Sequence, residues 1–305
     1  MLKKYEFTTG RIVETSDDDA PILVYLSPDE QERRFLTDCL RIDEHTLTSA
    51  LDPDELSRLE FEPEHTALIV KRPRNYSVEE QFMFRVTSMG LFLFKERLVV
   101  VVSESDPMFD GRTFSGVNTV MDAMFRLIYQ SITHFLQHLK VMNMVSEELE
   151  QKINASMENR YLLNLFALEK SLVYYLNALH TNSVLISKLK NSRAKIGIVE
   201  EQLEFLDDIS VENEQCYKLA EIYSNVLAGL MDARASIVNN NLNVLMKTLN
   251  IITIGIMVPT FVVSAFSMNV DIPLQHQSHV FWFVMGLAAV SAAGVMWFWR
   301  HKKFW

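Results

Sequence analysis

The segment LNIITIGIMVPTFVVSAF, residues 249–266, is followed after a short polar loop by VFWFVMGLAAVSAAGVMWFW, residues 280–299. The two segments are 18 and 20 residues long and contain no charged residue. A helix rises 1.5 Å per residue, so each segment is long enough to cross a hydrocarbon core about 30 Å thick. The sequence therefore predicts two transmembrane helices, near 248–266 and 280–299, joined by a loop at 267–279.

Basic residues flank the two segments on one side only, and they predict the orientation. The loop holds no Lys or Arg; the flanking basic residues are Lys247 before the first segment and, in the tail 300–305, Arg300, Lys302 and Lys303. Lys and Arg near the ends of membrane helices are retained on the cytoplasmic side. We therefore expect a multi-pass protein of the inner or plasma membrane of a prokaryote, with both termini in the cytoplasm and the loop outside.

One face of the first predicted helix carries polar and thioether side chains at steps of three and four residues. We call this set the polar stripe. It comprises Asp232, Ser236, Asn239, Asn243, Met246, Asn250, Thr253, Met257, Thr260 and Ser264, and Leu249 lies beside it. Polar groups cost free energy in lipid and normally face a bundle interior or a water-filled path. Several copies of the helix are therefore expected to share this face around an axis.

Two simpler interpretations compete with a shared axis. The helices could merely anchor a soluble domain, and Thr253 or Thr260 could bond back to a carbonyl of its own helix. Neither interpretation explains why Asn243 and Asn250 lie on the same line. The second span has no such stripe and intersperses large apolar side chains with Gly, Ala and Ser, which predicts an outer helix that packs closely on a neighbour.

The middle of the chain predicts long helices. No proline occurs between Pro107 and Pro259, and the composition is rich in Leu, Met, Glu, Lys, Gln and Asn. Helices are expected near 115–156, 159–192 and 198–266, the last as a continuous stalk into the first span. We assign 113–247 to a cytoplasmic helical bundle and stalk and 248–305 to a transmembrane pore domain.

The first 112 residues predict a cytoplasmic mixed α/β domain, because prolines punctuate short runs of β-branched and aromatic residues. Ser27 and Glu30 have the spacing of a capping box, with Pro28 at the first helical position. The helices expected here are near 28–40 and 44–51. The expected strands are 22–26, 66–70, 82–86, 90–94 and 97–102.

Several C-terminal motifs resemble those of a known family. Met246-Lys247-Thr248-Leu249 leads into the first span, Pro259 lies near its middle, Ser267-Met268-Asn269 follows its end, and Lys302-Lys303-Phe304-Trp305 ends the chain. In these motifs the chain resembles the CorA family of divalent metal-ion transporters, whose signature reads Gly-Met-Asn. The resemblance implies an α+β membrane protein that forms a funnel-shaped homopentamer. It also implies passive transport of Mg²⁺ above all, with Co²⁺ and Ni²⁺ as further substrates.

The resemblance assigns the selectivity filter to Ser267, Met268 and Asn269, with a ring of Asn269 carbonyls at the outer mouth. Mg²⁺ dehydrates reluctantly, so neutral amide oxygens can accept hydrogen bonds from the waters of the hydrated ion. Ser267 replaces the family's Gly and lacks the backbone freedom of Gly. This departure leaves the ion's identity open, and the family's zinc-transporting branch, which also departs from the signature, is an alternative.

Further roles are expected nearer the cytoplasm. Met246 and Leu249 would narrow the path as a hydrophobic gate that closes by dewetting, and Asp232 would form a carboxylate ring below it. In the resembling family, carboxylates between subunits bind regulatory Mg²⁺. Asp207 and Asp208 are candidates for one half of such a site, although acidic pairs are often only a solvated face.

Composition excludes several other functions. The net charge of −10 makes nucleic acid an improbable partner, and no phosphate-binding loop or Ser/His/Asp arrangement points to an enzyme or an ATP-driven pump. The expected partners are other copies of the chain, the lipid bilayer and divalent cations. No cofactor is expected besides Mg²⁺ as substrate and regulatory ligand, and Cys39 and Cys216 are expected as reduced thiols.

Three weaker signals remain open. His134 and His138 are spaced to bind Zn²⁺ from one helix face or to lie on a helix surface or interface. Asp271, His276 and His279 in the loop could attract cations or be solvated. Finally, a membrane-anchored regulatory protein could have this architecture without conducting ions.

Overall fold

The computed structural model describes residues 1–76, 82–104, 108–109, 112–155, 159–269 and 279–301. These residues fall into two units, Met1–Gly229 and Leu230–Trp305. Helix α6 (Glu200–Phe266) is one uninterrupted element that begins in the first unit and ends in the second. The predicted domain boundaries near 112 and 247 stay predictions.

Seven strands form one mixed sheet in the first unit. In spatial order they are β2 (Arg11–Thr15), β1 (Leu2–Thr8), β3 (Ile22–Leu26), β7 (Leu98–Val102), β6 (Val86–Leu93), β5 (Thr66–Pro73) and β4 (Arg58–Phe61). Only the β3–β7 pair among these strands is parallel, with Leu23 opposite Val99. The central strands β3 and β7 are buried along their whole length, as their continuous apolar sequences require.

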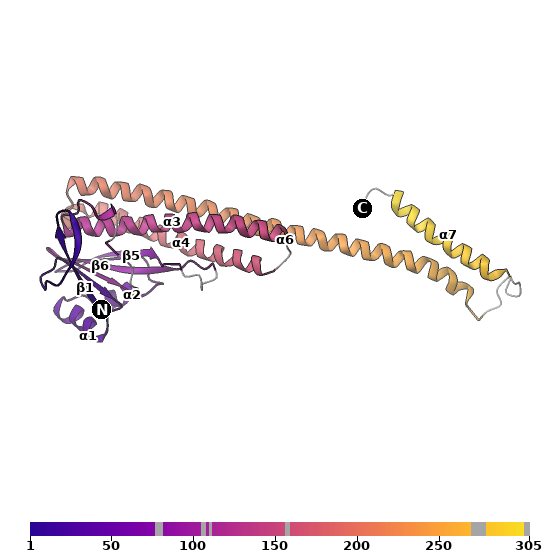
Figure 1. Cartoon of the computed structure of the whole chain (residues 1–305), viewed down its shortest axis with the longest axis horizontal. Coiled ribbons are helices and arrows are strands. Elements are labelled where there is room, and N and C mark those ends of the chain that lie inside the picture. The colour runs from indigo at the N-terminus through magenta and orange to yellow at the C-terminus, as the bar shows by residue number, and fades with distance from the viewer. Residues whose placement is uncertain (77–81, 105–107, 110–111, 156–158, 270–278, 302–305) are drawn as a thin grey trace. The chain divides into compact units, whose positions relative to one another are not determined.

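Helices cover both faces of the sheet (Figure 1). The described helices are α1 (Glu30–Arg34), the π-helix η1 (Phe35–Cys39), α2 (Glu44–Leu51), the 3₁₀ turn η3 (Arg112–Phe114), α3 (Val120–Ala155), α4 (Asn159–Asn191), α5 (Arg193–Ile196), α6 and α7 (Val280–His301). Helix α2 packs on one face, while α3 and α4 pack on the other. Alternation along the strands directs Ile69, Val99 and Val101 into the core beneath α2.

The first part of α6 lies against α3 and α4. The Gln202 amide donates to the Asp122 carboxylate at 2.8 Å, and the buried Asn213 amide donates to the Leu179 carbonyl at 2.9 Å. The Arg126 guanidinium lies 4.3 Å from the centre of the Phe205 ring. These contacts make a three-helix bundle, in which α3 and α4 also contact the sheet.

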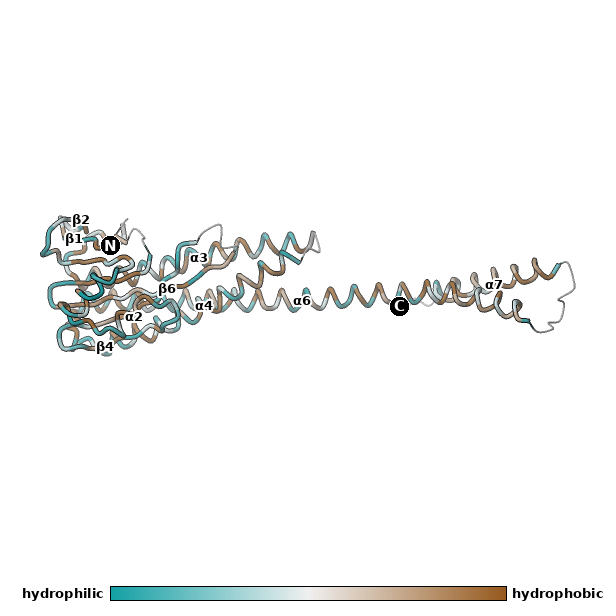
Figure 2. Tube along the Cα trace, turned by 90° about the horizontal axis from the view of Figure 1, so that it is seen from below, coloured by the Kyte–Doolittle hydropathy of each residue, from teal (hydrophilic) through white to brown (hydrophobic). Residues whose placement is uncertain are grey.

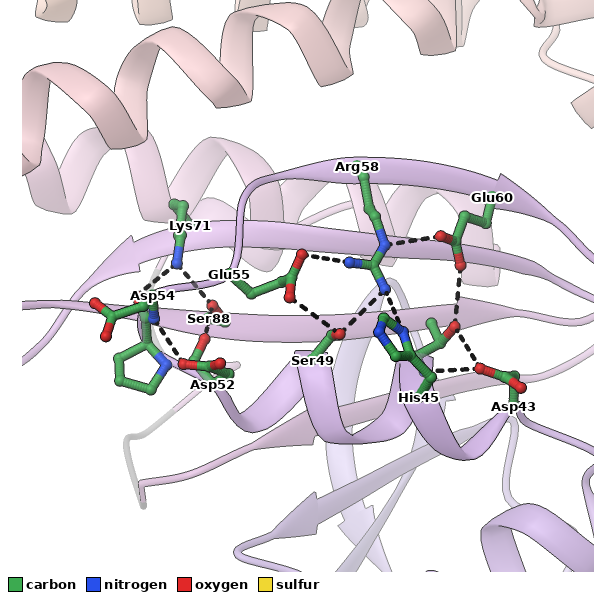
Figure 3. A network of polar contacts seen from close by, with 12 residues as sticks. Asp43, His45, Ser49, Asp52, Asp54, Glu55, Arg58, Glu60, Lys71 and Ser88 are labelled. Atoms are coloured by element: carbon green, nitrogen blue, oxygen red, sulfur yellow. Dashed lines mark hydrogen bonds and ion pairs between the residues drawn. The ribbon is translucent and has the colours of Figure 1, made fainter.

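A polar network ties α2 and the loop after it to the sheet (Figure 3). Buried Lys71 donates from Nζ to the Pro53 carbonyl at 2.7 Å and to Ser88 Oγ at 3.0 Å. Ser88 Oγ in turn donates to the Asp52 carbonyl at 2.6 Å. Burial lowers the pKa of Lys71 to about 8, because the charged ammonium loses its hydration.

Several predicted elements match the structure closely. The predicted helix 44–51 and strand 22–26 have the observed bounds, and strand 66–70 continues to Pro73. The helices predicted near 115–156, 159–192 and 198–266 are α3, α4 and α6, each within about five residues at its ends. Strands β1, β2 and β4 were not predicted.

The predicted strands 82–86 and 90–94 are wrong as separate elements, because Val86–Leu93 is one strand, β6. Ser88 and Gly90 both lie inside this strand. In the fold Ser88 has hydrogen-bond partners, and Gly90 makes room for α2: a Cβ added at Gly90 would lie 2.5 Å from Ala50 Cβ.

The predicted capping box at Ser27 is also wrong, by two residues. Asp29 is the N-cap of α1: its carboxylate accepts from the Glu32 N–H at 2.8 Å, and the Glu32 carboxylate accepts from the Asp29 N–H at 3.0 Å. Ser27 has a φ of +44°, whereas an N-cap residue has a φ in the extended region.

The second unit contains the last part of α6 and all of α7. Both helices contain an apolar window long enough to span a membrane, and almost none of either window is buried within the chain. Figure 2 shows the hydrophobic colouring along both. An apolar helix this exposed needs lipid or other chains around it.

Candidate functional site

Helix α6 has two distinct faces in the second unit. Its half-buried residues recur every three or four positions and form one line, at Ile251, Gly255, Val258, Val262 and Phe266. Pro259, also half-buried, lies inside the helix without ending it. At about 100° per residue, the line points roughly 150° away from the mean direction of the polar stripe.

Helix α7 accounts for the half-buried line. Its own least exposed positions follow a similar spacing, at Val284, Ala288, Ser291 and Val295, and Ala288 is only 8% exposed. A cavity of about 440 Å³ separates the two helices near Trp299 and is lined on α6 by Val244, Lys247, Thr248, Asn250, Ile251, Thr253 and Ile254. The edge of the α7 contact therefore reaches Asn250 and Thr253, and the rest of the stripe lies beyond it.

Every residue of the polar stripe is exposed in the single chain, as are Leu249 and the three residues Ser267, Met268 and Asn269. Asp232, at one end of the stripe, is also exposed, and so is Arg300 at the end of α7. The described part of the second unit thus leaves the stripe uncovered. The only charged residue of the stripe is Asp232, which carries a carboxylate.

The threonines of the stripe bond back to their own helix. Thr253 Oγ1 donates to the Leu249 carbonyl at 2.8 Å, and Thr260 Oγ1 donates to the Ile256 carbonyl at 2.6 Å. The simpler interpretation of these two residues is therefore realised in the structure. A hydroxyl that donates inward still presents oxygen lone pairs outward, so both threonines can accept hydrogen bonds from water on the exposed face.

Helix α6 ends at Phe266, immediately before the three predicted filter residues. The Ser267 N–H donates to the Ser264 carbonyl at 3.1 Å in a turn that closes the helix. Asn269 is the last described residue of this segment, and the predicted loop residues Asp271 and His276 lie outside the described residues, as do Lys302 and Lys303 of the tail. His279 is described and exposed.

In the first unit, the two predicted regulatory carboxylates have different surroundings. Asp207 forms an ion pair with Lys190 of α4 at 2.5 Å, and Asp208 is exposed. Any regulatory ion at Asp207 would compete with this lysine. Among the described residues, no cluster of three or more His, Cys, Asp or Glu side chains is arranged to hold a metal ion.

His134 and His138 lie side by side on α3, with ring centroids 4.4 Å apart. Spacing predicted this proximity, but it could not predict the partner of His138, which is Tyr175 Oη of α4 at 2.7 Å from Nδ1. Cys39 is exposed and Cys216 is buried, and both are free thiols. Burial raises the pKa of Cys216 to about 12, which keeps this thiol protonated.

An α/β unit is followed by two helices with apolar windows, the long α6 and α7, and this is the architecture of a membrane protein that spans the bilayer twice. The uncovered stripe suits a transporter of ions. The family model described as CorA-like Mg²⁺ transporter protein matches residues 19–301. The chain belongs to this family of metal-ion transporters.

Individual relatives agree with this membership. The cobalt/magnesium transport protein CorA of Methanocaldococcus jannaschii is 26% identical over 277 residues, which are 86% of this chain and 84% of that protein. The complete structure of the CorA magnesium transporter from Methanocaldococcus jannaschii has a TM-score of 0.82 at 20% identity and covers 100% of this chain and 98% of that one. The fold of this chain is therefore the full-length CorA fold.

A further likeness covers the soluble part. The crystal structure of the ZntB cytoplasmic domain from Vibrio parahaemolyticus has a TM-score of 0.60 at 12% identity, and it covers 78% of this chain and 98% of that one. At this identity the likeness concerns the fold alone.

Proposed function

We propose that the chain forms a passive channel for divalent cations, with Mg²⁺ as the main substrate and Co²⁺ and Ni²⁺ as further ones. The observation that carries the proposal is the polar stripe of α6, which lies on the face that α7 does not cover, with Asn250 and Thr253 at the edge of that face. Exposed Asn and Thr oxygens in an apolar helix are costly in lipid and useful around a hydrated axis. Family membership supports metal-ion transport.

The stripe offers acceptor groups suited to a hydrated ion. Asn243, Asn250, Thr253 and Thr260 present oxygen atoms to which the waters around Mg²⁺ can donate. Because Mg²⁺ gives up its waters reluctantly, the channel does not need to strip the ion. Asn269 would form the corresponding ring at the outer mouth, with Ser267 and Met268 beside it in the filter.

A gate would lie nearer the cytoplasm. Met246 and Leu249 are each 57% exposed in the single chain. In a ring of copies, their apolar ends would meet and exclude water, and such a constriction closes by dewetting. Asp232 would then hold cations at the inner end, and Asn239 would lie between the two.

A closed ring of several copies is needed to cover the stripe, and we propose a homopentamer, as the family resemblance implies. We further propose that both termini lie on the cytoplasmic side of an inner or plasma membrane. The basic residues Lys247, Arg300, Lys302 and Lys303, which flank the two spans, support this orientation. Asp207 and Asp208 would bind regulatory Mg²⁺ between subunits after Asp207 exchanges Lys190 for the ion.

Ion uptake into liposomes tests the channel. Purified protein is reconstituted, and uptake of Mg²⁺, Co²⁺, Ni²⁺ and Zn²⁺ is compared between the natural chain, Asn269→Ala and the control Asn240→Ala, whose residue lies off the stripe. Saturable Mg²⁺ uptake that falls in Asn269→Ala alone supports the channel and the filter. Uptake of no ion by correctly assembled protein would refute conduction and favour a membrane-anchored regulatory protein.

A Zn²⁺ transporter is the second candidate. It is favoured by Ser267 in place of the signature Gly. Zn²⁺ uptake without Mg²⁺ uptake in the same assay would select it. The Ser267→Gly variant then tests whether this position determines ion selectivity. A gain of Mg²⁺ uptake would assign the selectivity to Ser267. Unchanged selectivity would assign it to Asn269 and the polar stripe.

A further inference from the structure

Two imidazoles lie next to each other in the first unit, on the face of α3 that meets the sheet and α4. His134 and His138 are one helical turn apart, with ring centroids 4.4 Å apart and ring planes at 69°. His138 is 9% exposed, while His134 is half-buried and lines a cavity of about 300 Å³. Imidazoles spaced four residues apart on a helix can share one metal ion.

His138 is held in the way that metal-binding histidines are held. One ring nitrogen, Nδ1, is 2.7 Å from Tyr175 Oη, and the ring packs edge-on against Phe84 at 5.4 Å. A ligand histidine generally uses its second nitrogen for such a hydrogen bond, which fixes the ring and its tautomer. Tyr175 thus leaves Nε2 of His138 as the nitrogen for a metal.

We propose that His134 and His138 together bind a borderline transition-metal ion, Co²⁺, Ni²⁺ or Zn²⁺, beside the cavity that His134 lines. The cavity is also lined by the amides of Gln130 and Gln137 on the same helix, and it has room for several waters to complete the coordination. Imidazole suits these metals, whereas Mg²⁺ prefers carboxylate, carbonyl and water oxygen. The site therefore discriminates against Mg²⁺.

The guanidinium of Arg72 lines the same cavity and opposes a dication. This positive charge lowers the affinity for the metal ion, so Arg72→Gln should tighten metal binding. The site is separate from the polar stripe and from Asp207, so metal binding there does not depend on conduction. In a Mg²⁺ channel it would let the cytoplasmic unit respond to transition metals that enter with Mg²⁺.

Isothermal titration calorimetry on the untagged full chain in detergent tests the site. Metal is first removed with chelator, and Ni²⁺ or Zn²⁺ is then titrated in excess Mg²⁺, which occupies oxygen-rich sites. We expect one Mg²⁺-resistant site per chain, weakened at least tenfold by His134→Ala and tightened by Arg72→Gln. The control is His180→Ala, which removes an exposed imidazole on α4.

Tyr175→Phe tests whether the orientation of the His138 ring matters for metal binding. It keeps both imidazoles and removes only the hydrogen bond to His138 Nδ1. Loss of such a partner typically weakens metal binding by about 10–100-fold, and we expect a loss in this range. The proposal is overturned if no Mg²⁺-resistant site is found, or if His134→Ala binds as tightly as the natural chain. His134 is half-buried, and a melting temperature measured without metal checks that this variant is folded.

Discussion

His138 Nδ1 lies 2.7 Å from Tyr175 Oη, and this hydrogen bond joins α3 to α4 within the core of the first unit. Both side chains are buried, and Phe135 packs edge-on against the Tyr175 ring at 4.8 Å. Tyr175→Phe keeps the ring and removes only the hydroxyl. The imidazole nitrogen is then buried without this partner, so we expect a loss of about 1–3 kcal/mol in the free energy of unfolding.

Chemical denaturation of the full chain in detergent measures this loss. Tyr174→Phe is the matched control, because Tyr174 is the adjacent residue and is 46% exposed. Its hydroxyl can be replaced by water contacts, so the stability should change by less than about 0.5 kcal/mol. Equal effects of the two variants would contradict a specific role for the His138–Tyr175 bond.

Lys71 predicts a pH dependence with a definite sign. Its pKa is about 8 in the folded chain, against an ordinary value of 10.5. Between these values the unfolded chain holds a proton that the folded chain has released, so stability rises with pH, by at most about 1.4 kcal/mol per unit. Below pH 8 the side chain is protonated in both states and this contribution is constant.

The measurement compares unfolding of the natural chain with Lys71→Met from pH 7 to 10. The stability of the natural chain relative to the variant should increase above pH 8, because the variant lacks the titrating group. Lys140→Met, at an exposed position of α3, should retain the rise. Parallel curves for the natural chain and Lys71→Met would show that burial of Lys71 does not perturb its ionisation.

Gly90 sets the distance between α2 and the sheet. A Cβ at this position would lie 2.5 Å from Ala50 Cβ and 3.0 Å from the Phe92 ring. Gly90→Ala therefore forces α2 outward, and we expect a destabilisation of about 1–3 kcal/mol, read from the denaturation midpoint. Gly229→Ala in α6 meets no atom within 4 Å and should stabilise its helix by up to about 1 kcal/mol.

A second change distinguishes steric overlap from loss of glycine flexibility. Ala50→Gly removes the opposing Cβ, so the double variant with Gly90→Ala should be more stable than the sum of the two single effects. Additive effects would mean that the overlap with Ala50 is not the cause.

Sequence predicted the elements whose pattern is local. The helix 44–51 has an apolar face with capping residues beside it, and the two spans are long and free of charged residues, so their bounds follow from residue type. Strands β1, β2 and β4 carry charged residues and are only partly buried. β2 and β4 are the edges of the sheet, where one side lacks a strand neighbour and the apolar alternation is weak.

In the candidate sites, too, local features could be predicted and contacts between distant residues could not. The polar stripe was predictable because helical geometry alone fixes which residues share a face. The face that α7 covers could not be predicted, since its packing depends on residues of a second helix, such as Ala288. Tyr175 is likewise 37 positions from His138, so no local pattern could indicate that it orients a histidine.

The final prediction compares two adjacent residues of α6, one on the polar stripe and one on the half-buried line. Asn250 belongs to the polar stripe, whereas Ile251 belongs to the half-buried line directed at α7. Asn250→Leu replaces an amide by an apolar group of similar size, so the hydrated ion loses hydrogen-bond acceptors in every copy. One hydrogen bond is worth about 1 kcal/mol, and several copies lose one together, so Mg²⁺ uptake into liposomes should fall at least about tenfold.

Ile251→Leu is the control, because it conserves volume on the half-buried line and should leave uptake unchanged. Size-exclusion chromatography in detergent must show the same assembly for both variants, which removes oligomer loss as the cause. If Ile251→Leu reduced uptake as much as Asn250→Leu, the ion path would not follow the stripe. If neither variant changed Mg²⁺ uptake, the oxygen atoms of α6 would not line the path, and the proposed channel axis would be wrong.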